Sequence, residues 1–399
     1  MARKIRLSSS VRGLCVACFC AGFMLLNMWS GCTRPLEDKD IGETIESWNI
    51  RSLPPRIHNA AESLHILIWN DYFPPALFEA FEKIYGVRIE ASYFESNEQM
   101  REYYLSDREK WDLLMPSDYT VHLLIRQNEV TQIDRNKLQW FDQISPVMFD
   151  LKCDPGLNYF VPVFHSSFGM SFNVKYLGGF PRKWDYLDAH RANPFFNGRL
   201  ALPDQMRTSL GLALIRLGFS PNSRSEPEIE QAADYLISLV ETCGARFVGD
   251  RIVQDGTWKD FLLLPTWSGT GAWLLSENLD YRFLIPEEDT IFAVDGFVIP
   301  RASRNKETAY LFLNFLMTPE VLAKAAEFSY YAPTSLAAAR RVNTFIKHGP
   351  SMLMPSGDDR ISLEDVGDSE ALYEKAWVRV KTAQAPSDLK TIPLSLIAY

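Results

Sequence analysis

The sequence feature that most constrains the fold is an alternation of short apolar runs with helical segments between residues 64 and 127. Three runs have the length of strands: Leu64–Trp69 and Val87–Phe94, which are rich in β-branched and aromatic residues, and the short apolar run Asp112–Met115. A helical segment follows each run, beginning near Pro75, at the capping sequence Ser96–Gln99, and over Val121–Gln127. This order predicts a parallel sheet covered by helices, and therefore an α/β fold.

The rest of the chain continues the pattern. Strands are expected at Leu200–Pro203, Phe261–Trp267 and Tyr281–Ile285, and helices at Met206–Leu217 and Pro227–Thr242. The run Ile291–Pro300 is expected to be a long strand that crosses between two lobes. Further helices are expected at Ala309–Met317, Pro319–Phe328 and Leu363–Lys381.

The ends of the first three strands carry aromatic rings and carboxylates and no Lys or Arg. These ends read Trp69-Asn70-Asp71-Tyr72, Tyr93-Phe94-Glu95 and Pro116-Ser117-Asp118-Tyr119. Ligands of such sheets bind beyond the carboxyl ends of the strands, and a ring beside a carboxylate suits an ammonium group. A purely structural interpretation is also open, in which Asp71 and Asp118 cap helices, Glu95 is solvated and the rings are core.

The sequence offers no catalytic or cofactor motif. The six histidines are scattered without metal-ligand spacing, and neither a phosphate loop nor a Gly-x-Ser-x-Gly elbow is present. A net charge of −9 argues against general nucleic-acid binding, which needs surplus Lys and Arg. We therefore expect no metal, no cofactor and no nucleic-acid partner, and a protein that is not an enzyme.

The first 32 residues differ from the rest in charge. They carry four basic residues and no acid, which leaves 37 basic against 50 acidic residues and a net charge of −13 for the remainder. Leu14–Trp29 is a 16-residue uncharged run, shorter than the about 20 residues of a membrane span. Because Ser30-Gly31-Cys32 resembles a bacterial lipoprotein box, we expect residues 1–31 to be a signal peptide and Cys32 to be lipidated. An ordinary signal peptide or an uncleaved anchor is the alternative.

The segment that follows is interpreted as a tether. Residues 32–62 are polar, without apolar periodicity, and contain Pro54-Pro55. Export would place the last two cysteines, Cys153 and Cys243, in an oxidising compartment. Burial as small apolar residues is expected for them, and the sequence leaves a disulfide between them open.

An ordered series of short motifs carries a family resemblance. The motifs lie at Trp69–Pro75, Phe94–Glu98, Asp112–Tyr119, Arg216–Ser220, Trp267–Gly269, Asp295–Pro300, Asn314–Leu316 and Tyr331–Thr334. Over residues 64–385 the series resembles the bacterial spermidine/putrescine-binding proteins of ABC importers. This resemblance implies a two-lobe periplasmic-binding-protein fold with a hinge and a ligand cleft between the lobes. It implies lobe 1 at 63–162 and 296–399, and lobe 2 at 163–295, with some C-terminal helices free to pack on lobe 2.

The resemblance also implies site residues. Matched by position, the aromatic box is Trp69, Tyr72, Tyr119, Trp267 and Tyr331. Asp295 matches the central amine-binding aspartate, Asp71 a second acid and Ser117 a polar cleft residue, and Asn70 is included beside Asp71. Phe94 and Asp118 are interpreted as neighbours of the site.

The chain departs from the family at several expected site positions. Gln205 and Thr208 replace an acidic pair, Thr270 replaces a residue that is sometimes acidic, Ala293 replaces an aromatic, and Leu363 replaces a glutamine. Each lost charge-assisted hydrogen bond weakens binding by about 10- to 150-fold. The departures indicate a shorter ligand such as putrescine, a different amine, or uncharged groups at the far end of the ligand.

Together these observations predict an exported, lipid-anchored, monomeric solute-binding protein of the periplasm or cell envelope. It would capture putrescine or spermidine and deliver it to an ABC permease and ATPase complex. One alternative is the same fold binding another solute, such as thiamine or an amino acid. A second is a surface lipoprotein that acts as a sensor or adhesin, and an enzyme with a dyad in the cleft is a third.

Overall fold

The computed structural model describes part of the 399-residue chain. The described residues are 48, 50, 52–177, 179–188, 194–249, 252, 256–355, 360–385, 387 and 389, all within the unit Glu43–Tyr399. The expected signal peptide 1–31, Cys32 and most of the expected tether lie outside the described residues.

The first sheet is parallel, as the strand–helix alternation predicts. It has the order β2–β1–β3, from β1 (Ser63–Trp69), β2 (Arg88–Phe94) and β3 (Leu113–Leu114). Helix α2 (Pro75–Tyr85) ends at Gly86, which adopts a left-handed conformation with φ of 72°. Helix α3 (Asn97–Ser106) begins at the predicted cap, where the Ser96 hydroxyl accepts a hydrogen bond from the Gln99 backbone N–H.

Helix α4 (Asp118–Arg126) begins three residues before the expected position. The apolar periodicity starts at Val121, but Ser117 is already the extended N-cap residue, with φ of −79° and ψ of 160°. Because this first turn is polar yet buried, periodicity alone misses it.

A second, six-stranded sheet is built on β4 (Val161–Asn173), a strand that the sequence analysis did not predict. The sheet order is β10–β4–β9–β11, and β7 and β8 also pair with β4. Its other strands are β7 (Leu263–Trp267), β8 (Tyr281–Leu284), β9 (Thr290–Phe297), β10 (Ala332–Pro333) and β11 (Arg360–Ile361). All 13 residues of β4 are buried, so its sequence shows no alternation of polar and apolar residues.

The remaining strands and helices cover these sheets. A two-stranded parallel sheet consists of β5 (Ala201–Pro203) and β6 (Arg246–Val248). The other α-helices are α5 (Met206–Arg216), α6 (Glu226–Cys243), α8 (Ser268–Glu277), α9 (Lys306–Met317), α10 (Pro319–Ser329), α11 (Leu336–Ala339), α12 (Thr344–His348) and α13 (Glu370–Thr382). Helix α13 begins seven residues after the expected Leu363, because Gly367, with φ of 60°, starts a 3-10 turn before it.

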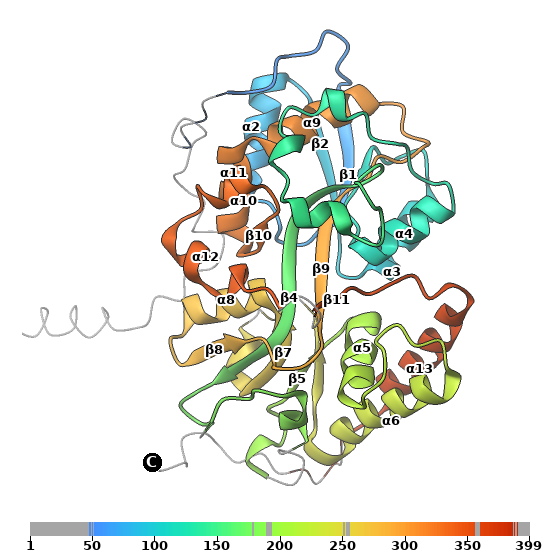
Figure 1. Cartoon of the computed structure of the whole chain (residues 1–399), viewed down its shortest axis with the longest axis vertical. Coiled ribbons are helices and arrows are strands. Elements are labelled where there is room, and N and C mark those ends of the chain that lie inside the picture. The colour runs from blue at the N-terminus through green and yellow to red at the C-terminus, as the bar shows by residue number, and fades with distance from the viewer. Residues whose placement is uncertain are drawn as a thin grey trace, which may run out of the picture. The chain divides into compact units, whose positions relative to one another are not determined.

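Two main hydrophobic cores lie at either end of the paired strands β4 and β9 (Figure 1). The first is formed mainly by β1–β3, α2, α9, α10 and β4 up to Phe164. The second is formed by β4 from Phe168 onward, α5, α6 and one face of α13. The fold is therefore the expected two-lobe α/β fold, and β4 passes from one core to the other through residues 165–167.

Two negative findings apply to the described part of the chain. None of its helices combines the length and the apolar character that a membrane crossing requires. Cys153 and Cys243 form no disulfide with each other, and they pack against different cores.

Candidate ligand-binding site

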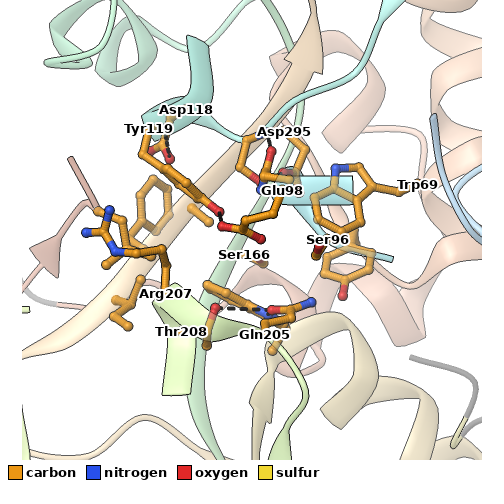
Figure 2. A pocket seen from close by; sticks show the side chains of 18 of the residues that line it. Trp69, Ser96, Glu98, Asp118, Tyr119, Ser166, Gln205, Arg207, Thr208 and Asp295 are labelled. Atoms are coloured by element: carbon orange, nitrogen blue, oxygen red, sulfur yellow. Dashed lines mark hydrogen bonds between the residues drawn. The ribbon is translucent and has the colours of Figure 1, made fainter. Parts of the chain in front are cut away.

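A cavity of about 40 Å³ lies where elements of the two lobes meet, beside residue 166 of β4 (Figure 2). One buried water needs about 10–15 Å³ on this scale, so the cavity admits a slender molecule. Seven of the nine predicted ligand-binding residues line it: Trp69, Tyr72, Ser117, Tyr119, Trp267, Asp295 and Tyr331. The topology thus gathers residues that are far apart in sequence.

Asp295 is an acid of this cavity whose carboxylate accepts two side-chain hydrogen bonds. It lies on β9, and its carboxylate accepts hydrogen bonds from the Ser117 hydroxyl at 2.6 Å and the Tyr72 hydroxyl at 2.7 Å. The Asn97 amide in turn donates to the Ser117 hydroxyl at 3.0 Å. Burial raises the pKa of Asp295 to about 6, and the two hydrogen bonds only partly oppose this rise. The group is therefore mainly ionised at neutral pH, although no cation of the described chain pairs with it.

Aromatic rings form one wall beside this carboxylate. The Trp69 and Tyr72 rings stack with centroids 6.2 Å apart, and Tyr331 packs on Tyr72 at 5.0 Å. The buried Trp69 Nε1–H finds no acceptor among the described residues, which leaves a donor beside the cavity. A ring face next to a carboxylate stabilises an ammonium group by cation–π attraction and charge.

Glu98 supplies a further carboxylate that the sequence analysis missed. It lies in the first turn of α3 and lines the cavity, and its Oε1 accepts a hydrogen bond from the Tyr119 hydroxyl at 3.3 Å. Figure 2 shows its side chain pointing toward Tyr119 at the centre of the site. Ser96–Gln99 was interpreted as a helix cap and Phe94–Glu98 as a family motif, but Glu98 was not named as a site residue, although its place after β2 carries it toward the site.

The side of the cavity formed by lobe 2 is polar but largely uncharged. Gln205 Oε1 accepts hydrogen bonds from the Trp267 indole N–H at 3.2 Å and the Thr208 hydroxyl at 3.1 Å. Ala293 and Leu363 also line the cavity, whereas Thr270 does not. Four of the five departures from the family pattern are therefore part of this wall.

Arg207 is the exception to this neutrality, and it too was missed. Its guanidinium is buried, lies 5.6 Å from the centre of the Tyr119 ring, and donates to the Glu364 carbonyl at 3.0 Å and to Asn222 Oδ1 at 3.1 Å. It makes no ion pair with a described residue. The cavity thus holds a cation at one end as well as carboxylates.

The two other predicted site residues are not among those that line the cavity. Asp71 adopts a left-handed conformation with φ of 58° and is exposed, and its charge contributes to a raised pKa of Tyr93. Asn70 donates to Glu95 Oε1 at 3.3 Å. The left-handed turn after β1 therefore directs Asp71 to the surface.

Asp118, which the sequence analysis interpreted only as a neighbour of the site, lines the cavity and is buried.

A two-lobe α/β fold with an aromatic and acidic cavity where the lobes meet defines the class of periplasmic solute-binding proteins.

Comparisons with known proteins specify the class further. The chain belongs to the bacterial extracellular solute-binding proteins, whose family model matches residues 76–352. This membership confirms the expectation of an exported binding protein that is not an enzyme.

Among its relatives is the spermidine/putrescine-binding periplasmic protein of Salmonella typhimurium, 28% identical over 332 residues, which are 81% of this chain and 92% of the relative. A putative spermidine/putrescine ABC transporter protein from Listeria monocytogenes has a similar structure. Its TM-score is 0.75 at 27% identity, covering 81% of this chain and 99% of that one. A spermidine/putrescine substrate-binding protein from Streptococcus pneumoniae has a TM-score of 0.65 at 25% identity, over 80% and 100% of the two chains.

Proposed function

We propose that the protein captures a polyamine, putrescine or spermidine, and delivers it to an ABC permease and ATPase complex. The observation that carries this proposal is the Asp295 carboxylate, buried beside Trp69 and Tyr72 without a cation of the described chain to balance it. A buried carboxylate is costly unless a cation pairs with it, so the site favours a ligand that brings an ammonium group. The relatives named for spermidine and putrescine support the same ligand class.

The distribution of charge favours a short polyamine. Asp295 and Glu98 both belong to elements near the first sheet, whereas Gln205 and Thr208 are the neutral groups opposite them. Glu98 forms one acidic position and Asp295 with the neighbouring Asp118 forms a second, so two ammonium groups can each meet one, while a third would meet an amide or the Arg207 guanidinium. We therefore expect putrescine to bind at least as tightly as spermidine.

A thermal-shift and calorimetry screen of putrescine, spermidine, thiamine and amino acids tests the proposal. Because a ligand at 100 times its Kd stabilises the folded state by about 2.7 kcal/mol, a bound polyamine will raise the Tm by several degrees. If neither polyamine changes the Tm at millimolar concentration, the assignment is wrong.

Arg207 favours one second candidate, a zwitterionic ligand such as an amino acid. Its buried guanidinium has no carboxylate partner in the described chain and lies at the end of the cavity formed by lobe 2. A ligand with an ammonium group at Asp295 and a carboxylate at Arg207 would match both charges. In the same screen, a shift with amino acids and none with polyamines selects this candidate.

We further propose that the mature protein is a monomer anchored to the membrane by lipid at Cys32. The short uncharged run before Ser30-Gly31-Cys32 supports this anchor. Mass spectrometry of the protein purified from membranes tests it, since Cys32→Ala would abolish the lipid adduct. For the two lobes we propose residues 63–162 and 296–399 in lobe 1 and residues 163–295 in lobe 2. Helix α13 packs on the second core.

A further inference from the structure

Asp118 is a buried acid with one unused oxygen. It is 2% exposed, lies at the start of α4 and lines the ligand cavity. Its Oδ1 accepts a hydrogen bond from the Tyr119 backbone N–H at 2.9 Å, whereas its Oδ2 is buried without a hydrogen bond to a described residue. A buried carboxylate with one unsatisfied oxygen is costly in its charged form, because its hydrogen bonds compensate the lost hydration only in part.

Asp295 lies close to this acid. The backbone of Ser117, the residue before Asp118, is bridged to the backbone of Asp295, and the Ser117 hydroxyl donates to the Asp295 carboxylate at 2.6 Å. The two acids therefore belong to paired segments and line one cavity. Two carboxylates buried together do not both ionise readily unless a cation neutralises them.

The groups around the pair supply no such cation. The titratable or polar groups that face Asp118 or share its cavity include Asp295, Cys153, Tyr119, Glu98, Arg207, Tyr72, Tyr331, Ser362 and the Val294 backbone. Among them only Arg207 is positive, and it hydrogen-bonds to Asn222 and Glu364 instead. Neither Asp118 nor Asp295 forms an ion pair with a described residue.

The expected titration agrees with this geometry. Burial raises the pKa of Asp118 well above its ordinary value and the charge of Asp295 raises it further, while polar contacts with Tyr119, Ser362 and Val294 oppose the rise. Burial also raises the pKa of Asp295, to about 6. Of the two acids, Asp118 therefore holds a proton more readily, because Asp295 already accepts two side-chain hydrogen bonds.

We propose that Asp118 is protonated in the ligand-free protein and releases this proton to solvent when a ligand ammonium group enters beside Asp295. The O–H bond of the acid breaks, its electron pair stays on the carboxylate, and the ammonium group keeps all of its protons. One proton thus leaves the cavity as one ammonium group enters it, so the net charge around Asp118 and Asp295 does not change. This coupling rests on the proposed function, because it requires a cationic ligand.

The sign of the pH dependence follows. Because binding releases a proton, raising the pH strengthens binding, by up to about tenfold per pH unit for each proton released. We expect the dependence to extend above the pKa of Asp295, which is about 6. A site with Asp295 as its single titrating acid would lose its dependence as the pH rises past that value.

The first test needs no ligand. Carbon-13 NMR of protein labelled at the aspartate carboxyl carbon follows every Asp as the pH is raised. We expect one resonance to titrate at higher pH than that of Asp295, and we expect Asp118→Asn to remove it. Asp107→Asn, at the exposed C-cap of α3, is the matched control and should remove a different resonance. If every carboxyl of the wild-type protein is ionised by pH 6.5, Asp118 does not hold the proton.

The second test counts protons during binding. Calorimetry with putrescine at pH 7.5, in buffers of different ionisation enthalpy, should give release of about one proton for wild type and about none for Asp118→Asn. Putrescine binding without proton release overturns the coupling and leaves the proposed function intact. If neither putrescine nor spermidine binds, the proposed function fails and the coupling fails with it. Both wild-type measurements decide the question even if Asp118→Asn does not fold.

Discussion

Asp295 illustrates how a binding residue works against stability. Its pKa is raised from 3.8 to about 6 in the folded protein, so the folded state binds more protons than the unfolded state between about pH 4 and pH 6. The free energy of unfolding of the ligand-free protein therefore falls as the pH rises through this window. The shift of about two units corresponds to an upper limit of about 3 kcal/mol above pH 6.

Asp295→Asn should accordingly stabilise the empty protein and weaken the liganded one. At pH 7.5 we expect a higher Tm than that of wild type in calorimetry, because a buried charge is removed. We expect polyamine affinity to fall at least tenfold, because a charge-assisted hydrogen bond worth about 1.5–3 kcal/mol is lost. At pH 4 the gain in Tm should disappear. Unchanged affinity in titration calorimetry would contradict the assigned role.

Glu98→Gln tests the acid that sequence reasoning missed. The substitution keeps an acceptor for the Tyr119 hydroxyl but removes the charge, so we expect polyamine affinity to fall by about tenfold with little change in Tm. Glu102→Gln, at an exposed position of the same helix, is the matched control and should leave affinity unchanged. Equal affinities for the two variants would show that Glu98 does not contact the ligand.

The difference between these two acids shows what the sequence reveals at the scale of single residues. Asp295, Trp267 and Tyr331 were predicted only by their match to family motifs, whereas Trp69, Tyr72 and Tyr119 were also predicted because they follow strand ends. Glu98 was hidden because Ser96–Gln99 already has a complete explanation as a helix cap. Asp71 was expected at the site, but it does not line the cavity. The left-handed φ of 58° that turns it outward could not be predicted from the sequence.

At the scale of elements, the beginning of α8 positions one wall of the site. Gly269 is the second residue of this helix, and a Cβ atom there would lie 2.7–2.8 Å from ring atoms of Tyr331. Contacts that short force the ring to move. The close approach of the helix therefore places Tyr331 against Tyr72.

Gly269→Ala should consequently displace Tyr331 and weaken ligand binding by several-fold, and it should lower stability by about 1–3 kcal/mol through overpacking. Titration calorimetry and thermal unfolding measure the two effects. Gly179→Ala is the control, since its Cβ would meet no atom within 4 Å. If Gly269→Ala binds polyamine as wild type does, the position of Tyr331 is not critical.

Strand β4 shows why some elements escape prediction from one sequence. Amphipathic helices such as α2 and α6 were located to within a few residues because one face is buried and the other is exposed. All residues of β4 are buried, including His165, Ser166 and Ser167 at its middle, so its polar and apolar residues follow no period. The topology that places these polar residues between two cores is a property of the whole chain.

At the scale of the molecule, the two cores are joined by few elements. Paired strands β4 and β9 run from one core to the other, and Cys153 and Cys243 pack against different cores and form no disulfide with each other. A covalent link would restrain relative motion of the lobes, whereas paired strands allow them to rotate about a hinge. The cavity at the junction is therefore the place where a ligand can couple the two lobes.

Ligand-dependent closure follows from this arrangement, and small-angle X-ray scattering measures it. A compact chain of this length has a radius of gyration of about 21 Å. We expect that value with saturating putrescine and a larger one without it, because Asp295 and Glu98 line one side of the cavity and Trp267 and Gln205 the other, so a bound ligand would link them. Asp295→Asn at the same putrescine concentration should keep the larger radius, which separates closure from a general effect of the diamine on scattering. Equal radii for wild type with and without bound putrescine would mean that the lobes are already closed before capture, and that the permease must recognise the bound ligand by something other than lobe rotation.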